Sequence, residues 1–334
     1  MTATILYNTN ISHIRPLNVR QDLSAVADLI ELCFSKQMDA DGRDYIRHLR
    51  QASQDFHYLK WMPGAAERVS IPLHGYIWEE DGKLVGNLTL IPFFWHSKWL
   101  YLIANVAVHP DYRQRGIARQ LTKRALDHIS DHGADSAWLQ VRDDNPIAHN
   151  LYLSEGFTER ARRTTWESID PVNGLPDIPE GVEITPRYDR DWNKQSAWLQ
   201  ELYPPEVAWN LPFDYNRYSP SLLRSLFRML SSDPVKQWCV RNSDGVIGFA
   251  IWEPSRSYAD PIWLATTPQW QDLSIRTLLP HARKSIFTSH SLIINYPAGQ
   301  AEEAFYECGF TSRNTLIWME ARFDGKVQHI SIDR

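Results

Sequence analysis

Hydrophobic and polar positions before residue 110 follow the pattern of three antiparallel strands. Leu73–Trp78 and Leu84–Phe94 are rich in apolar residues, and the polar turn Glu79–Gly82 between them ends in glycine. A second turn, His96–Lys98, leads into Trp99–Val108. This last run is apolar throughout, so we expect it to be buried on both faces of the sheet.

The pattern then changes to helical spacing. A helix is predicted from apolar positions three or four residues apart, namely Ile117, Leu121, Ala125, Leu126 and Ile129. Gly133 is placed to end this helix in the left-handed conformation. Ser136–Arg142 is a predicted strand, and Asn145 with Pro146 begins a last short helix that stops at Gly156. This order predicts an α/β (α+β) fold, in which a mixed, mostly antiparallel sheet is flanked by helices.

The chain repeats this arrangement. A Pro- and Gly-rich stretch, Asp170–Gly181, is typical of a linker. The two flanking segments begin alike, with the short strands Ser12–Leu17 and Val182–Arg187, and end alike, with Leu151–Phe157 and Ala304–Phe310. We therefore predict two tandem domains of one kind. Their predicted bounds are 1–172 for the first domain, 173–181 for the linker and 182–334 for the second domain.

The composition is that of an ordinary soluble globular protein. Of the 334 residues, 43% are hydrophobic and 22% are charged, and the formal net charge is −5 with no long basic run, which argues against a nucleic-acid partner. The apolar runs are shorter than the ~20 residues that span a bilayer, and no signal peptide is recognisable. We therefore expect no membrane association and a cytoplasmic location. Three scattered cysteines fit reduced thiols, and the histidines show no metal-ligand spacing.

The candidate chemistry lies in the turn between the strand that ends at Val108 and the helix that follows. The first amides of a helix have no intrahelical partners, and the helix dipole makes that end partly positive. Gly116 allows a ligand to approach the backbone closely, and Ala118 leaves room beside it. Further positive charge comes from Arg113, Arg115 and Arg119. The turn predicts a pyrophosphate site, although by itself it is also compatible with a solvated surface.

Two motifs in the first half resemble the acetyl-CoA signatures of the GCN5-related N-acetyltransferase (GNAT) superfamily. The first motif is Arg113-x-x-Gly116-x-Ala118, and the second is Asn145-x-x-Ala148-x-x-Leu151-Tyr152-x-x-x-Gly156-Phe157. The likeness covers roughly residues 12–168 and reaches the second half only as a faint copy.

This resemblance implies acetyl-CoA as cosubstrate, no metal, and a set of contacts. The backbone of Val106, Ala107 and Val108 would pair with the pantetheine arm, and the amides of Gln114, Arg115, Gly116, Ile117, Ala118 and Arg119 would hold the pyrophosphate. Asn145 would cap its helix beside the cofactor arm. Tyr152 would donate a proton to the departing sulfur, as a phenol of pKa ~10 can do at neutral pH. The alternative for Tyr152 is an aromatic residue of the core.

One departure from the superfamily concerns the base. Many members carry a carboxylate on the strand before the turn, but Leu102–Asn105 has none. Asn105 can orient a water molecule and cannot accept a proton. Candidate bases are Asp39, Asp41 and Asp44, in the loop expected after a helix predicted over Leu23–Phe34, and Glu79 and His96 near strand ends. Each of these is also an ordinary surface charge, and we assign no base.

The second half lacks the features of the first. Leu264–Arg276 aligns with Val106–Ala118 through a shared proline. Ser274 and Arg276 then stand where the first half has its glycine and small residue, and Phe305 falls at the position of the tyrosine. We expect a degenerate domain with a structural or substrate-shaping role.

The sequence thus predicts transfer of an acetyl group from acetyl-CoA to a primary amine by direct attack in a ternary complex. A non-catalytic acyl-CoA sensor and a transferase for a longer acyl group stay open as alternatives. The acceptor is expected to be a small-molecule or peptide amine, in a cleft that Phe56–Trp61 and Tyr203–Tyr218 would line. We expect a monomer, its halves packed as an internal pseudo-dimer, or a homodimer.

Overall fold

The computed structural model describes residues 13–38, 40–54, 74–169, 177–213, 215–220, 235–255 and 257–323. Within these ranges the chain forms two compact units. The first unit contains the described residues up to 139, together with 150–158 and 320–323, and the second contains those of 140–149 and 159–319.

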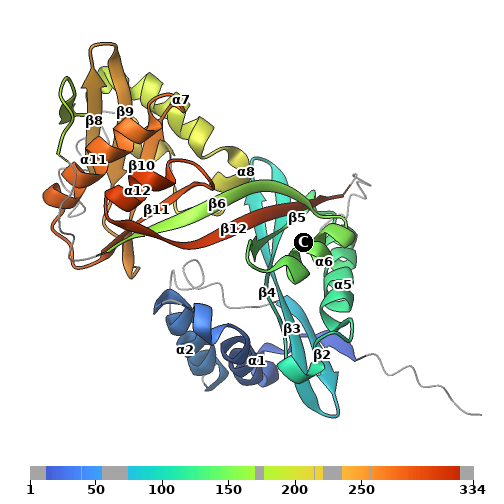
Figure 1. Ribbon diagram of the computed structural model, residues 1–334. Helices are drawn as coiled ribbons and strands as arrows, with labels where there is room; N and C mark the ends of the chain where they lie inside the picture. Colours follow the sequence, from blue (N-terminus) through green and yellow to red (C-terminus); the bar gives the residue numbers. More distant parts are fainter. Residues whose placement is uncertain are drawn as a thin grey trace, which may run out of the picture. The chain divides into compact units, whose positions relative to one another are not determined.

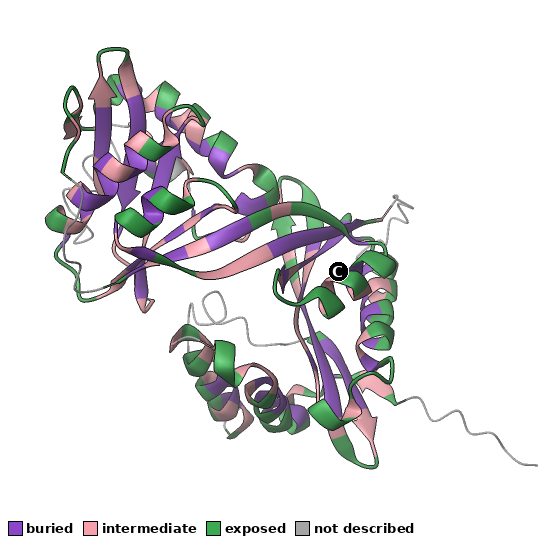
Figure 2. Cartoon of the chain, viewed as in Figure 1, coloured by how far each residue is buried: buried purple, intermediate pink, exposed green. Residues whose placement is uncertain are grey.

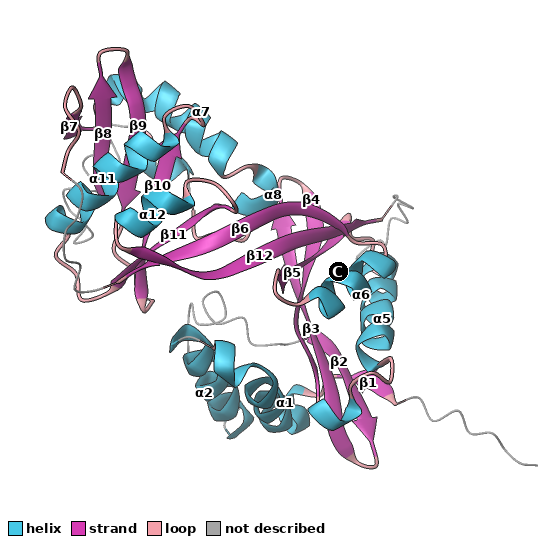
Figure 3. Cartoon of the chain, viewed as in Figure 1, coloured by secondary structure: helices cyan, strands magenta, loops and turns pink. Residues whose placement is uncertain are grey.

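The first unit is a mixed sheet with helices against it (Figures 1 and 3). In chain order its elements are β1 (Ile14–Pro16), α1 (Val19–Phe34), η1 (Ser35–Gln37), α2 (Ala40–Gln54), β2 (His74–Glu80), β3 (Lys83–Trp95), β4 (Lys98–Val108), η2 (Pro110–Tyr112), α5 (Ile117–Asp131), β5 (Ser136–Arg142) and α6 (Pro146–Ser154). Both β5 and α6 run from one unit into the other. Described strands follow the order β1-β2-β3-β4-β5, with antiparallel pairs except for the parallel pair β4–β5.

Different helices cover the two faces of this sheet. Successive strand residues point to opposite faces, so Ile77 of β2 packs with α1 and α2, whereas Tyr76 contacts α5 through His128. Figure 2 shows the buried strand residues in purple. A Cβ atom on Gly86 of β3 would lie 2.9 Å from a methyl carbon of Ile117. Glycine at this position therefore lets the start of α5 lie close to the sheet.

Two expectations for this unit need correction. The loop expected after α1 contains α2, whose buried positions Ile46, Leu49 and Ala52 have helical spacing. β4 is not buried on both faces, because Trp99 is 52% exposed. Among the described residues, its parallel pairing with β5 is limited to Leu100–Leu102, so most of β4 has no strand partner on that side.

The second unit repeats the same order of elements. They are β6 (Thr158–Ser168), β7 (Glu183–Pro186), η3 (Asp189–Asp191), α7 (Trp192–Leu202), α8 (Pro205–Ala208), α9 (Tyr215–Tyr218), β8 (Lys236–Asn242), β9 (Gly245–Trp252), β10 (Ala259–Thr266), α11 (Gln271–Ser285), β11 (Ser291–Pro297), α12 (Glu302–Glu307) and β12 (Phe310–Arg322). Its described strands follow the order β12-β6-β11-β10-β9-β8-β7.

The topology of this second sheet confirms the internal repeat. β7 to β10 are antiparallel neighbours and β10 pairs with β11 in parallel, as β1 to β5 do in the first unit. Gly248 on β9 has the role of Gly86 on β3, because a Cβ there would lie 2.5 Å from the Ser274 hydroxyl of α11. The predicted fold class, two tandem domains with mixed, mostly antiparallel sheets, is confirmed.

One strand departs from a simple tandem arrangement. β6 ends the first half of the sequence, yet Arg163–Glu167 pairs with Ile293–Pro297 of β11 in the second unit. The compact units therefore differ from the predicted domains in the assignment of this strand, and also of residues 140–149 and 320–323. Residues 173–176 of the predicted linker lie outside the described residues, and the predicted bounds of the sequence repeat stay a prediction.

Candidate active site

β4 leaves regular pairing at Asn105. This residue has a φ of 52°, in the left-handed region, and the register between β3 and β4 shifts there. Two residues of β4 consequently lie opposite one residue of β3, which is a β-bulge. The segment Val106–Val108, predicted to pair with a pantetheine arm, follows directly. Since pairing with β5 ends at Leu102, β5 does not pair with this segment.

The turn after β4 has the geometry of an anion cradle. Gln114 and Gly116 have φ values of 62° and 78°, and α5 begins at Ile117 with no side chain capping its first amides. The amide of Gln120 donates to the Gly116 carbonyl at 3.0 Å, so the amides of residues 117–119 precede the first intrahelical bond of α5. A Cβ on Gly116 would have the Gln120 side chain, 3.9 Å away, as its nearest neighbour. The backbone is thus open to a ligand on this side.

The arginines of the turn are each held by a neighbour. Arg113 donates to the Val108 carbonyl at 3.1 Å, Arg115 pairs with Glu80 at 3.2 Å, and Arg119 pairs with Glu155 at 2.9 Å. The charges of Arg115 and Arg119 are therefore partly compensated. Arg115 is exposed, and a surface ion pair contributes only ~0–1 kcal/mol, so a phosphate can replace Glu80 at small cost. The Glu155 side chain is only 8% exposed, so we expect Arg119 to keep this partner.

Tyr152 lies in the helix that Arg119 ties to the cradle. Arg119 donates to the hydroxyl of Ser154 at 2.9 Å, in the same helical turn of α6 as Tyr152. The tyrosine ring is 7% exposed and packs edge-on against Phe157, as the alternative interpretation expected. Burial raises the pKa of the Tyr152 hydroxyl to about 12, so the hydroxyl is protonated at neutral pH. Its role toward a sulfur stays a prediction.

Asn145 has the capping geometry that its motif predicts. Its side-chain oxygen accepts a hydrogen bond from the Ala148 amide at 3.1 Å, at the start of α6. Asn145 belongs to the residues grouped with the second unit. Its predicted position beside a cofactor arm stays a prediction.

The structure singles out none of the five candidate bases. Asp39 lies outside the described residues, Asp41 and Asp44 are exposed on α2, Glu79 pairs with Arg15 at 2.9 Å, and His96 occupies the β3–β4 turn.

Among the described residues, no group of three or more His, Cys, Asp or Glu side chains could hold a metal ion, and no helix is long and apolar enough to cross a membrane.

The corresponding region of the second unit is built differently, and its predicted alignment is corrected. Only residues 267–270 separate β10 from α11, whereas residues 109–116 separate β4 from α5. Ser274 therefore lies inside the first turn of α11 and not at its N-cap. Its hydroxyl is buried and donates to the Ile247 carbonyl at 3.0 Å. The second unit has a shorter turn with no equivalent of the Gly116 cradle.

In the second unit, a tyrosine side chain is hydrogen-bonded to the backbone of β10. The Leu264 amide donates to the hydroxyl of Tyr203 at 3.3 Å, and Tyr203 is fully buried. Phe305 stacks on Trp166 with ring centroids 4.7 Å apart. The described part of the segment Tyr203–Tyr218 contributes aromatic rings to this core, where an acceptor cleft was expected, and Phe56–Trp61 lies outside the described residues.

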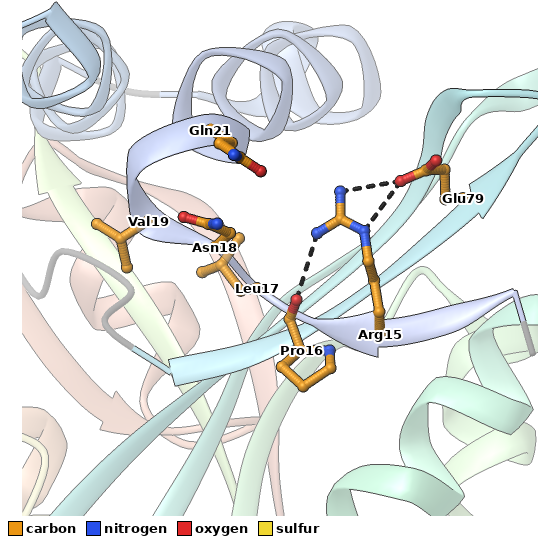
Figure 4. A pocket seen from close by; sticks show the side chains of 7 residues that line it. All are labelled: Arg15, Pro16, Leu17, Asn18, Val19, Gln21 and Glu79. Atoms are coloured by element: carbon orange, nitrogen blue, oxygen red, sulfur yellow. Dashed lines mark hydrogen bonds and ion pairs between the residues drawn. The ribbon is translucent and has the colours of Figure 1, made fainter.

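A pocket of about 680 Å³, wide open to solvent, lies at the junction of β1 and α1 (Figure 4). Its lining residues are Arg15, Pro16, Leu17, Asn18, Val19, Gln21 and Glu79, none of which belongs to the predicted cofactor site. Arg15 pairs with both Asp22 and Glu79. The charge of Arg15 is compensated by these two carboxylates, so this pocket is not suited to bind an anion.

Comparison with known sequences bears directly on β4 and its turn. The sequence model of the acetyltransferase (GNAT) family matches residues 35–157, which contain β4, the cradle and Tyr152. This region is a GNAT acetyltransferase domain. The resemblance seen in the two motifs is thereby confirmed, and the GNAT domain includes every predicted cofactor-binding residue.

Individual relatives match parts of the chain. The ribosomal protein bS18-alanine N-acetyltransferase of Escherichia coli (strain K12) is 39% identical over 67 residues, which are 20% of this chain and 45% of that protein. The mycothiol acetyltransferase of Thermomonospora curvata is 30% identical over 134 residues, 39% of this chain and 42% of that protein. The chain thus spans less than half the length of either relative.

A solved structure shares the fold over both units. The GCN5-related N-acetyltransferase of Sphaerobacter thermophilus superposes with a TM-score of 0.55 at 12% identity, covering 93% of this chain and 96% of that one. The likeness therefore extends beyond the GNAT domain into the second unit.

Proposed function

We propose that this protein transfers an acetyl group from acetyl-CoA to a primary amine. The observation that carries the proposal is the combination of two features in the GNAT domain: the strand segment Val106–Val108, unpaired with β5, and the uncapped amides at the start of α5. The strand segment suits the amide-bearing arm of CoA, and the helix start suits its pyrophosphate. The space beside Gly116 fits a ligand that lies against the backbone.

Acetyl-CoA supplies a thioester whose carbonyl carbon the amine nitrogen attacks. The C–N bond forms, the C–S bond breaks with its electron pair on sulfur, and the proton lost from nitrogen is balanced by one gained at sulfur. With a pKa of about 12, Tyr152 is a weaker acid than a thiol of pKa ~8.5. We therefore assign Tyr152 the donation of a hydrogen bond to the departing sulfur. The proton itself comes from solvent or from the acceptor nitrogen.

A non-catalytic acyl-CoA sensor is the second candidate, and Asn105 favours it. No carboxylate stands on β4 near the bulge, and the side-chain nitrogen of Asn105 is hydrogen-bonded to Tyr45 at 2.8 Å. A transferase for a longer acyl group is a further candidate. We propose a small-molecule or peptide amine as acceptor, a monomer or homodimer, and a cytoplasmic location.

Release of free thiol separates transferase from sensor. We expect acetyl-CoA alone to be stable with the protein and thiol to appear when a suitable amine is added. The panel needs both peptides with free N-termini and small polyamines or amino sugars, because the two relatives are named for unlike substrates. Tight CoA binding without thiol release from any amine at any pH between 6 and 9 would favour the sensor.

A further inference from the structure

The bulge in β4 is held by side chains outside the predicted site. Asn87 of β3 donates from its side-chain nitrogen to the Asn105 carbonyl at 2.9 Å. Asn105 in turn donates from its own side-chain nitrogen to the hydroxyl of Tyr45 on α2 at 2.8 Å. Side chains from β3 and α2 are thus both hydrogen-bonded to the bulged residue of β4.

The first of these hydrogen bonds fixes the direction of a peptide group. In a trans peptide, the carbonyl and the following N–H point in opposite directions. The Asn105 carbonyl is directed at the side chain of Asn87, so the N–H of Val106 points away from that side chain. The edge of β4 that lies away from β3 pairs with β5 earlier in the strand. This is the edge proposed to receive the arm of CoA.

The surroundings of Asn87 indicate that its side-chain NH2 group, which donates to Asn105, is the functional part of the residue. Asn87 is fully buried, and its side-chain oxygen has no hydrogen-bond partner. Burying an unsatisfied acceptor is unfavourable, so the position is a poor choice for packing alone. The left-handed φ of Asn105 also needs support from neighbours, because such conformations persist only where the surrounding structure holds them.

We propose that Asn87 and Tyr45 are positioning residues that hold the β4 bulge and aim the Val106 amide at the pantetheine arm. This inference rests on the proposed function, because it assumes that CoA lies along β4. Their effect passes through the backbone of Asn105.

Thr89 provides a matched control for Asn87. It lies two residues further along β3 and therefore on the same face, it is fully buried, and its hydroxyl also lacks a partner. Thr89→Val removes a buried polar group that has no hydrogen bond to Asn105. Asn87→Ala removes a buried polar group and the bond to Asn105.

The test compares CoA with its nucleotide fragment, 3′-phospho-ADP, which has the phosphates but no pantetheine arm. For Asn87→Ala we expect the Kd of CoA to rise about tenfold, the equivalent of one misdirected hydrogen bond, and that of the fragment to stay unchanged. Thr89→Val should change neither. Equal weakening of both ligands by Asn87→Ala, or unchanged CoA affinity, would overturn the inference and leave the proposed function standing. Failure of the wild-type protein to bind CoA would overturn both.

A second pair of variants tests the bulge itself. Asn105→Gly and Asn105→Ala both lose the bond to Tyr45, but only alanine has to adopt the left-handed conformation against its side chain. We expect the glycine variant to bind CoA about tenfold more tightly than the alanine variant. Equal affinities would show that the conformation of Asn105 does not affect binding of the pantetheine arm, and would overturn the inference.

Discussion

Replacement of Gly116 by glutamate is expected to lower the affinity for CoA about a thousandfold. Two unit charges of the same sign ~4 Å apart cost ~4 kcal/mol at the effective dielectric of a protein surface, which corresponds to roughly that factor. The new side chain would also fill the space in which Gly116 has no neighbour nearer than 3.9 Å. Fluorescence or calorimetric titration with CoA measures the change.

Gly133 supplies the control for this substitution. It has a φ of 68°, close to the 78° of Gly116, and it lies at the other end of the same helix, where a Cβ would meet no atom within 4 Å. Gly133→Glu carries similar backbone strain and the same added charge, at the end of α5 where the helix dipole disfavours a negative charge, so it should be at least as destabilising as Gly116→Glu. CoA affinity should fall only for Gly116→Glu. Normal affinity in the folded Gly116 variant would show that the cradle does not bind CoA.

The second large effect is expected from Tyr152→Phe. The loss of a hydrogen bond to a charged sulfur is worth ~1.5–3 kcal/mol, so turnover should fall by about tenfold to a hundredfold while CoA affinity changes little. Single-turnover measurements with a saturating amine isolate the chemical step. Unchanged single-turnover rates would assign Tyr152 to the core alone.

The pH dependence gives a separate check on Tyr152. Because burial raises its pKa to about 12, the hydroxyl should not ionise between pH 8 and pH 10, and no loss of turnover in that range should depend on this residue. The wild-type protein and Tyr152→Phe should therefore show profiles of the same shape there. An alkaline decline that disappears in the variant would mean that Tyr152 ionises at a much lower pH.

Much of the fold was predictable because local patterns and tertiary packing agree. The apolar spacing that predicts α5 is that of Ile117, Leu121, Ala125, Leu126 and Ile129. Four of these side chains are buried, and Leu126 is half-buried. The strands around the turns Glu79–Gly82 and His96–Lys98 were predicted within a few residues. α2 was missed although Ile46, Leu49 and Ala52 carried the helical signal.

The remaining differences come from interactions between distant segments. Pairing of β4 with β5 ends at Leu102 and a bulge follows at Asn105, and an apolar sequence reveals neither. The pairing of β6 with β11 joins residues more than a hundred positions apart. The shorter turn before α11 was hidden because Pro110 and Pro268 each stand two residues after the end of their strand. The helices then begin at different distances from the proline, at Ile117 and at Gln271.

The candidate site likewise has features that local sequence signals predict and features that depend on contacts between distant segments. The motif glycine, the asparagine cap and the tyrosine are local signals, and the sequence placed each on its element. The partners that compensate the arginines, Glu80 and Glu155, lie on other elements and were not anticipated. Asn87 and Tyr45 were also missed, because a hydrogen bond to a bulged carbonyl leaves no sequence signature.

Calorimetric titration of the full chain with CoA tests most directly whether the cradle is the cofactor site. We expect one molecule bound per chain, at the cradle of the GNAT domain, because the second unit has a shorter turn before α11 and its own tyrosine on the edge of β10. Gly116→Glu should abolish this single binding event, and Ser274→Gly should not create another. Two equivalent CoA molecules per chain, or one that persists in Gly116→Glu, would contradict this assignment.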